Sequence, residues 1–241
     1  SQDREILACV IERTGGPEEK SFPHENEAAD ISEYSEDVII EGLLTSGLIG
    51  MGGAGFPVHK KYETEKRIDT ILINGAECEL FLTCDCRVMV EQGYGVINGT
   101  RLMLKASGAD QAYICIEDNK PDAIKNLQKI LEEMKSQGYF EKEKPVQVQV
   151  LPTKYPQGGE RQLIESVLGR EVPMGGLPAD VGVIVSNVGT AKAAADVVLG
   201  KKPLISRIVT VTGNVKEPGN YLVPIGTSAK ELIQLCGGVT T

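Results

Sequence analysis

The sequence Gly50-Met51-Gly52-Gly53-Ala54-Gly55-Phe56-Pro57 is the most informative loop of the chain. Its four glycines leave the main chain without Cβ atoms, so a ligand can approach the backbone closely. A second segment, Asn74-Gly75-Ala76-Glu77-Cys78-Glu79, follows the strand-like run 68–73 and presents two carboxylates where parallel sheets usually bind ligands. A glycine-rich wall that faces an acidic rim suits a flat cofactor better than a protein partner.

Strand-like and helix-like runs alternate through most of the chain. We expect strands at 68–73, 111–116, 146–151 and 181–186, and helices from Ser35 to near Gly47 and over 87–106, 121–137, 161–168 and 190–199. Such alternation is typical of the α/β class, with a mostly parallel sheet covered by helices.

The pattern changes after Pro203. Strand-like runs at 207–212 and 221–224 and a short helix at 228–235 indicate part of a small mixed domain. We therefore predict three parts: the end of an N-terminal module and a linker (1–34, with a strand at 4–13), a ligand-binding α/β domain (35–203), and a small, incomplete domain (204–241).

Composition excludes several kinds of partner. The 241 residues carry a formal net charge of −9, only 5% aromatics and no tryptophan, which argues against nucleic acid and against anionic membrane surfaces. No apolar run is long enough to cross a bilayer, so no direct membrane insertion is expected. The N-terminus does not resemble a signal peptide. Six dispersed cysteines are typical of a reducing compartment, and we expect a cytoplasmic protein.

The glycine loop matches a known fingerprint only in its letters. Gly50, Gly52 and Gly55 fit G-x-G-x-x-G, but a helical pattern precedes them where a Rossmann fingerprint needs a strand. Two interpretations remain open: a loop that contacts a cofactor in another way, or a tight turn that packs two elements.

Three other sites place polar residues where helices are expected to begin. They are Gly158-Gly159-Glu160, Asn187-Val188-Gly189-Thr190, and Lys60-Lys61 after the glycine loop. Unpaired N–H groups and a partial positive charge make a helix start suitable for a phosphate. The alternatives are that Asn187 and Thr190 are simple caps and that the two lysines are solvated.

The cysteines do not fit a metal site. Cys78, Cys84 and Cys86 form C-x5-C-x-C, which matches neither the usual iron–sulfur spacing nor a structural zinc pattern. We expect small, half-buried residues in a loop and no metal ligand in this chain; a redox or metal-touching role is the alternative. Signature motifs of hydrolases and kinases do not occur.

Four motifs in order resemble the RnfC family, the NADH-binding subunit of the ion-pumping NADH:ferredoxin oxidoreductase, related to the 51-kDa flavin-carrying subunit of complex I. They are residues 50–57, residues 74–79, Leu151-Pro152-Thr153-Lys154-Tyr155-Pro156-Gln157-Gly158-Gly159-Glu160, and Gly169-Arg170-Glu171-Val172-Pro173 with Gly175-Gly176-Leu177-Pro178. The match begins near residue 40, and the terminal piece resembles the β-grasp-like SLBB domain.

The resemblance implies a non-covalent FMN that takes a hydride from NADH and hands on single electrons. The flavin contacts carried over from the family are Gly50, Gly52, Gly53, Lys61, Asn74, Glu77, Glu79, Gly158, Glu160, Asn187 and Thr190. Phe56, Gly55 and Glu160 fall where NADH would bind. The flavin carries the chemistry, so no catalytic acid or base is expected.

The resemblance also implies partners. We expect other subunits of a membrane electron transport complex, a peripheral position on the inner face of the cell membrane, and iron–sulfur clusters in the full-length protein outside this chain. The chain has Glu79-Leu80-Phe81-Leu82-Thr83 where the family reads Glu-Pro-Tyr-Leu-Thr, and Met51 and Ala76 replace an arginine and an aspartate of the complex I relative. Two alternatives follow: a PrdC-like soluble protein that feeds electrons to proline reductase, and a flavin-free docking module that retains the fold.

Overall fold

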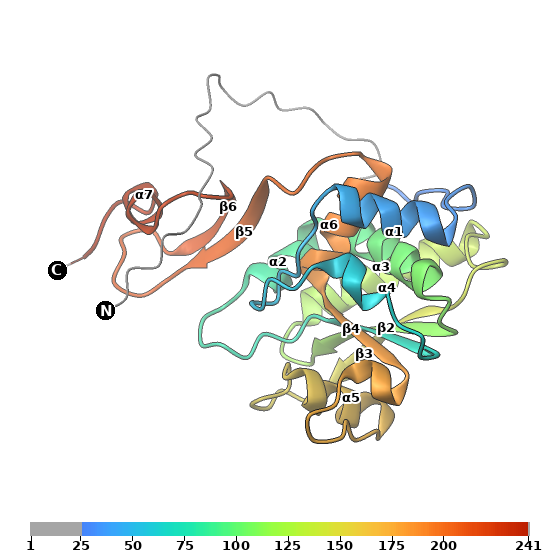
Figure 1. Ribbon diagram of the computed structural model, residues 1–241. Coiled ribbons are helices and arrows are strands. Elements are labelled where there is room, and N and C mark those ends of the chain that lie inside the picture. Colours follow the sequence, from blue (N-terminus) through green and yellow to red (C-terminus); the bar gives the residue numbers. More distant parts are fainter. Residues whose placement is uncertain (1–25, 241) are drawn as a thin grey trace, which may run out of the picture.

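A four-stranded parallel sheet lies at the centre of the molecule (Figure 1). The computed structural model describes residues 26–240, so the strand predicted at 4–13 lies outside the described residues. The strands are β1 Thr70–Asn74, β2 Gln111–Glu117, β3 Val146–Leu151 and β4 Val183–Asn187, in the order β3-β2-β1-β4. All three pairings are parallel, which confirms the predicted fold class.

Helices cover both faces of this sheet. The larger core packs one face against α1 Glu36–Thr45, α3 Gly93–Ser107, α4 Pro121–Ser136 and α6 Val188–Leu199. The smaller core packs the other face against α5 Glu160–Leu168. Alternation along β1 produces this division, because Ile71 and Ile73 belong to the larger core and Leu72 to the smaller. Two short 3-10 helices complete this part: η1 Val58–Lys61 and η2 Pro178–Val181.

The helix predicted over 87–106 is wrong as a single element. The chain forms α2 Cys84–Glu91 and α3, separated at Gln92, whose φ of −128° and ψ of 34° are not helical. Asn126 of α4 donates hydrogen bonds from its side-chain amide to the carbonyl oxygens of Met89 and Val90. These bonds satisfy carbonyls that a helix end leaves free, which stabilises the end of α2.

Glycine lets α3 and α6 pack closely. A Cβ placed on Gly99 would stand 1.7 Å from the carbonyl oxygen of Ala191, a distance no side chain can occupy. Within the sheet's larger core these two helices are therefore fixed backbone against backbone, and α6 begins at the same sheet edge as the loop after β1.

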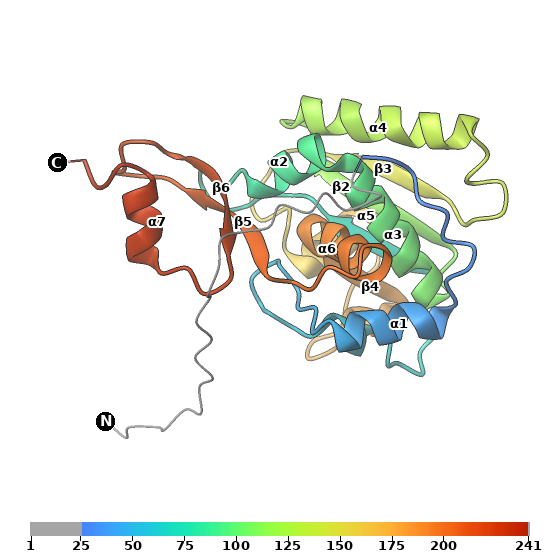
Figure 2. The ribbon, with the colours of Figure 1, turned by 90° about the horizontal axis from the view of Figure 1, so that it is seen from above.

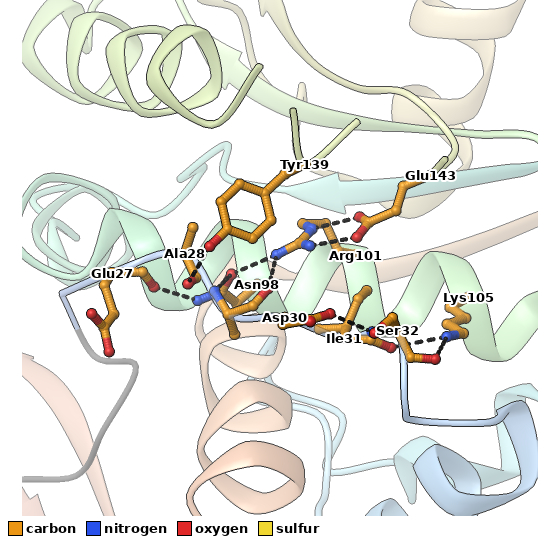
Figure 3. A network of polar contacts seen from close by, with 11 residues as sticks. Glu27, Ala28, Asp30, Ile31, Ser32, Asn98, Arg101, Lys105, Tyr139 and Glu143 are labelled. Atoms are coloured by element: carbon orange, nitrogen blue, oxygen red, sulfur yellow. Dashed lines mark hydrogen bonds and ion pairs between the residues drawn. The ribbon is translucent and has the colours of Figure 1, made fainter. Parts of the chain in front are cut away.

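The segment before α1 is tied to α3 by the polar network of Figure 3. Asn98 accepts from the Ala29 amide at 3.1 Å, and Arg101 donates to the Ala29 carbonyl at 2.8 Å. Arg101 also forms two hydrogen bonds with Glu143, and the Tyr139 hydroxyl donates to the Ala28 carbonyl. Because the buried guanidinium is engaged on all sides, this network holds the chain in place and is not suited to bind a ligand.

The C-terminal part is an antiparallel hairpin followed by a helix. β5 Ser206–Val211 pairs with β6 Gly219–Pro224, and α7 Ala229–Leu235 starts with a capping box between Ser228 and Glu231. Figure 2 shows the hairpin beside α2. Thr83, which precedes α2, receives a hydrogen bond from the Asn220 side-chain amide at 2.9 Å and donates its backbone N–H to the Thr210 hydroxyl at 3.2 Å.

Candidate cofactor site

Two strand ends place the candidate site at one edge of the sheet. Asn74 is the last residue of β1 and Asn187 the last of β4, and they are direct partners in the parallel register. Since neighbouring parallel strands end at the same edge, the loop after β1 and the start of α6 lie side by side.

The glycine loop runs over this edge between α1 and η1. Its ends are closed by a hydrogen bond from Gly50 N–H to the Phe56 carbonyl at 2.8 Å. Gly53 has a φ of +108° and Gly55 a φ of +61°, and a Cβ on either would meet no atom within 4 Å. Glycine is therefore required here by conformation, and the loop presents bare backbone to the outside.

The loop is pinned to the first turn of α6. Met51 donates its backbone N–H to the buried Thr190 hydroxyl at 2.8 Å. A Cβ on Gly52 would lie 3.5 Å from the Asn187 Cβ, so the loop backbone rests against the residue that starts α6.

The start of α5 is joined to the loop after β1. The Asn74 side-chain amide donates to the Gly158 carbonyl at 2.8 Å, and the Gly158 N–H donates to the Cys78 sulfur at 3.0 Å. A Cβ on Gly158 would stand 2.9 Å from the Ala76 carbonyl oxygen, so only glycine fits between these two segments.

Asn187 is the N-cap of α6. Its side-chain oxygen accepts from Gly189 N–H at 2.8 Å and Thr190 N–H at 3.3 Å, which confirms the capping interpretation for this residue. Thr190 is not a cap: it lies inside the helix, and its hydroxyl accepts from the glycine loop.

Lys60 and Lys61 do not open a helix, and that prediction is wrong. They end η1, because the loop after the glycines turns directly into this single 3-10 turn. Lys60 is exposed and pairs with Glu63 at 2.7 Å, as expected of a solvated lysine. Lys61 is half-buried and donates to the Val185 carbonyl at 2.5 Å; burial lowers the pKa of its ammonium group, and the nearby Glu160 carboxylate opposes that shift.

The predicted acids fall into two groups. Glu77 is internal: its side chain is fully buried, forms an ion pair with Lys120 at 3.0 Å and accepts from the Asp85 N–H at 2.8 Å. Glu79 and Glu160 are exposed. Phe56 is exposed over 48% of its surface, so together with these two acids it forms an accessible part of the site.

Three residues near the site were missed by sequence reasoning. Asp85 accepts from the Asn187 side-chain amide at 2.6 Å, and Arg207 of β5 donates to the Met51 carbonyl at 3.3 Å. Burial raises the pKa of Asp85 to about 6, although the Asn187 hydrogen bond acts in the opposite direction. Gln157 is fully buried, and within residues 26–240 neither its amide oxygen nor its nitrogen has a hydrogen-bond partner. Sequence offered one usable signal, the polar residue Gln157 beside Gly158; the other two contacts join distant segments.

The cysteines are small and at least half-buried, but two of the three are not in a loop. Cys84 and Cys86 lie in the first turn of α2, because this helix begins three residues earlier than predicted. Burial raises the pKa of both thiols. No cluster of three or more His, Cys, Asp or Glu side chains able to hold a metal occurs among the described residues.

These features define a known class of domain. Residues 43–196 match the model of the Nuo51 FMN-binding domain, and residues 208–241 match the SLBB domain. The chain belongs to the Nuo51 FMN-binding domain family, followed by an SLBB domain.

Its relatives confirm the resemblance to RnfC. It is 45% identical over 235 residues to the C-type subunit of the proton-translocating ferredoxin:NAD(+) oxidoreductase complex of Clostridium ljungdahlii, covering 96% of this chain and 49% of that protein. It is 38% identical over 248 residues to the corresponding subunit of the Na(+)-translocating complex of Acetobacterium woodii, covering 100% of this chain and 52% of that protein. The chain thus spans about half the length of these relatives.

Solved structures show the same fold. The crystal structure of an NAD+-reducing NiFe-hydrogenase in the H2-reduced state matches with a TM-score of 0.76 at 23% identity, over 85% of this chain and 39% of that one. Within residues 26–240, no helix has both the length and the apolar character needed to cross a membrane.

Proposed function

We propose that this chain is a flavin-dependent electron-entry module, which oxidises NADH by hydride transfer to FMN and passes electrons to iron–sulfur centres. One observation carries the proposal: four segments far apart in sequence (the glycine loop and the starts of the loop after β1, of α5 and of α6) are hydrogen-bonded together at one sheet edge. The match to an FMN-binding domain and the names of the relatives support electron transfer in an NADH-linked oxidoreductase.

The residues present fit a flavin. The glycine loop offers exposed backbone at Gly52 and Gly53, against which a planar ring can lie without meeting a Cβ. The unmet hydrogen-bonding capacity of buried Gln157 lies directly beside Gly158, which suits a site that takes a polar ligand. Lys61 supplies a half-buried positive charge for an anionic group.

The flavin would be held by residues from each of these segments. The contacts we assign are Gly50, Gly52, Gly53, Lys61, Asn74, Glu77, Glu79, Gly158, Glu160, Asn187 and Thr190. Glu77 and Asn187 would act mainly through the backbone that they order, because their side chains are engaged within the protein. When bound, FMN supplies the redox chemistry, accepting a hydride and releasing single electrons.

NADH would enter over the exposed part of the site. Phe56 offers an exposed aromatic face, Gly55 leaves space beside it, and Glu160 is an exposed acceptor at the start of α5. These residues would orient the nicotinamide, and orientation is the main requirement of hydride transfer because the reacting atoms must lie about 3–3.5 Å apart.

The names of the relatives favour a membrane-associated complex as the setting. We propose that the protein faces the cytoplasm, is peripheral to the inner face of the cell membrane, and contacts other subunits of an ion-translocating complex. Iron–sulfur clusters would be held by parts of the full-length protein outside this chain.

Anaerobic flavin spectroscopy on the full-length protein tests the proposal. The protein is loaded with FMN, and NADH is added while absorbance near the flavin maximum is followed. We expect rapid bleaching that reverses when an oxidant is added. FMN binding without bleaching would refute the NADH-oxidising role, and failure to bind FMN would favour the flavin-free docking module.

A further inference from the structure

A continuous chain of hydrogen bonds crosses the candidate site and includes one acid that is not among the assigned flavin contacts. Thr190 accepts from the glycine loop at Met51, Asn187 accepts from the Thr190 N–H, and Asp85 accepts from the Asn187 side-chain amide. The Asp85 N–H then donates to Glu77. Four separate segments therefore meet through Asn187 and Asp85.

Asp85 is suited to hold Asn187 in one rotamer. The Asn187 side-chain oxygen is occupied by two N–H groups of α6, so its amide nitrogen is the part that can reach another element. A carboxylate can only accept, and the 2.6 Å contact from that nitrogen to Asp85 Oδ2 is short, as in charge-assisted hydrogen bonds. The pair joins the start of α2 to the start of α6.

The surroundings of Asp85 are unfavourable to its charge on balance. It lies in the first turn of α2, which favours a carboxylate, and Arg207 on β5 is a nearby cation. Burial and the carboxylates of Glu77 and Glu79 in the preceding loop oppose ionisation, and the raised pKa is their combined result. A buried acid with a net cost is expected where function requires it.

We propose that Asp85 is a positioning residue of the cofactor site, which fixes Asn187 and through it the first turn of α6 and the glycine loop, at a cost to the stability of the fold. This inference rests on the proposed flavin function. It makes a distinctive prediction, since removing the charge of Asp85 should weaken cofactor binding and stabilise the protein at the same time.

The test compares Asp85→Asn with Asp37→Asn in the full-length protein. Asp37 is a matched control, because it is also the second residue of a helix but is exposed and remote from the site. FMN affinity is measured at pH 7.5 by quenching of flavin fluorescence, and the melting temperature without FMN is measured alongside. We expect Asp85→Asn to bind FMN about tenfold more weakly, the size of effect that follows from losing a hydrogen bond to a charged group. Its melting temperature should rise, whereas Asp37→Asn should change neither value beyond a small helix-end effect.

A second readout needs no cofactor. The side-chain amide resonances of Asn187, followed by NMR, should shift as the pH passes through about 6 and should stop doing so in Asp85→Asn. This separates titration of Asp85 from that of the FMN phosphate.

The outcomes are distinguishable. Wild-type protein that does not bind FMN refutes the proposed function. Wild-type binding with unchanged affinity in Asp85→Asn refutes the positioning role alone. A parallel fall in affinity and melting temperature, or failure of the variant to fold, shows an ordinary structural acid and also overturns the inference.

Discussion

At the scale of single residues, the polar side chains of this sheet edge bind one another before they bind anything else. Asn74, Glu77 and Asn187 are all engaged in bonds between segments. Their chemistry therefore shapes the backbone around the site, while Glu79, Glu160 and Phe56 remain accessible. Substitutions in the two groups should have different signatures.

Asp85 makes the stability of the fold depend on pH. Its pKa rises from 3.8 to about 6 on folding, so its favourable contribution is complete below pH 3.8 and is lost as the pH rises through 6. Between pH 7.5 and pH 5 this group should add about 1 kcal/mol to the free energy of unfolding. Urea titrations of wild type and Asp85→Asn at both pH values give the contribution by difference. A gap between the two proteins that does not narrow at pH 5 would contradict it.

Glu160→Gln should separate function from folding. Glu160 is exposed at the first position of α5, so the substitution removes a charge from the site and only a weak helix-end interaction from the fold. We expect NADH oxidation to fall about tenfold and the melting temperature to change little. Glu165→Gln, on the exposed part of the same helix, is the control. Equal losses of activity and thermal stability would show that Glu160 is structural.

At the scale of elements, periodicity predicted most helices and strands because each buries its own apolar pattern. β3 was predicted at its observed bounds, and Ser35 caps α1 as its sequence indicated. The break between α2 and α3 could not be predicted, because it depends on Asn126, 36 and 37 residues from the carbonyls it binds. The same limit applies to Asp85 and Arg207, whose partners are more than 100 residues away.

The C-terminal hairpin should contribute to the site through its contacts with the main domain. Asn220 binds Thr83 directly before α2, and Thr210 accepts from the Thr83 N–H. Asn220→Ala removes the first contact and leaves the hairpin strands paired through their backbones. We expect FMN affinity to fall roughly fivefold, as for one neutral hydrogen bond of about 1 kcal/mol. Asn214→Ala, elsewhere in the hairpin, should leave it unchanged; equal effects of both variants would contradict a specific contact.

At the scale of the whole molecule, the sequence motifs and the sheet topology agree. The residues assigned to the flavin come from α5, α6, the glycine loop and the loop after β1, and the parallel sheet brings those segments to one edge. The motifs made the gathering of these segments predictable. The exact bonding could not be predicted, since it depends on how α6 packs against α3 at Gly99.

Binding of FMN should therefore stabilise the whole fold and not a single loop. A ligand at a hundred times its Kd adds about 2.7 kcal/mol to the free energy of unfolding, which for a domain of this size is roughly 5–10 °C in melting temperature. Lys61→Gln should reduce this shift, because it removes the half-buried positive charge of the site. Lys60→Gln, which alters an exposed lysine one residue earlier, should retain it. Differential scanning fluorimetry of the full-length protein with FMN, and with riboflavin to remove the phosphate, makes the comparison. If Lys61 meets the phosphate, the two lysine variants should differ with FMN and agree with riboflavin; a melting temperature that FMN leaves unmoved in the wild type would instead identify a docking module that retains the fold without the flavin.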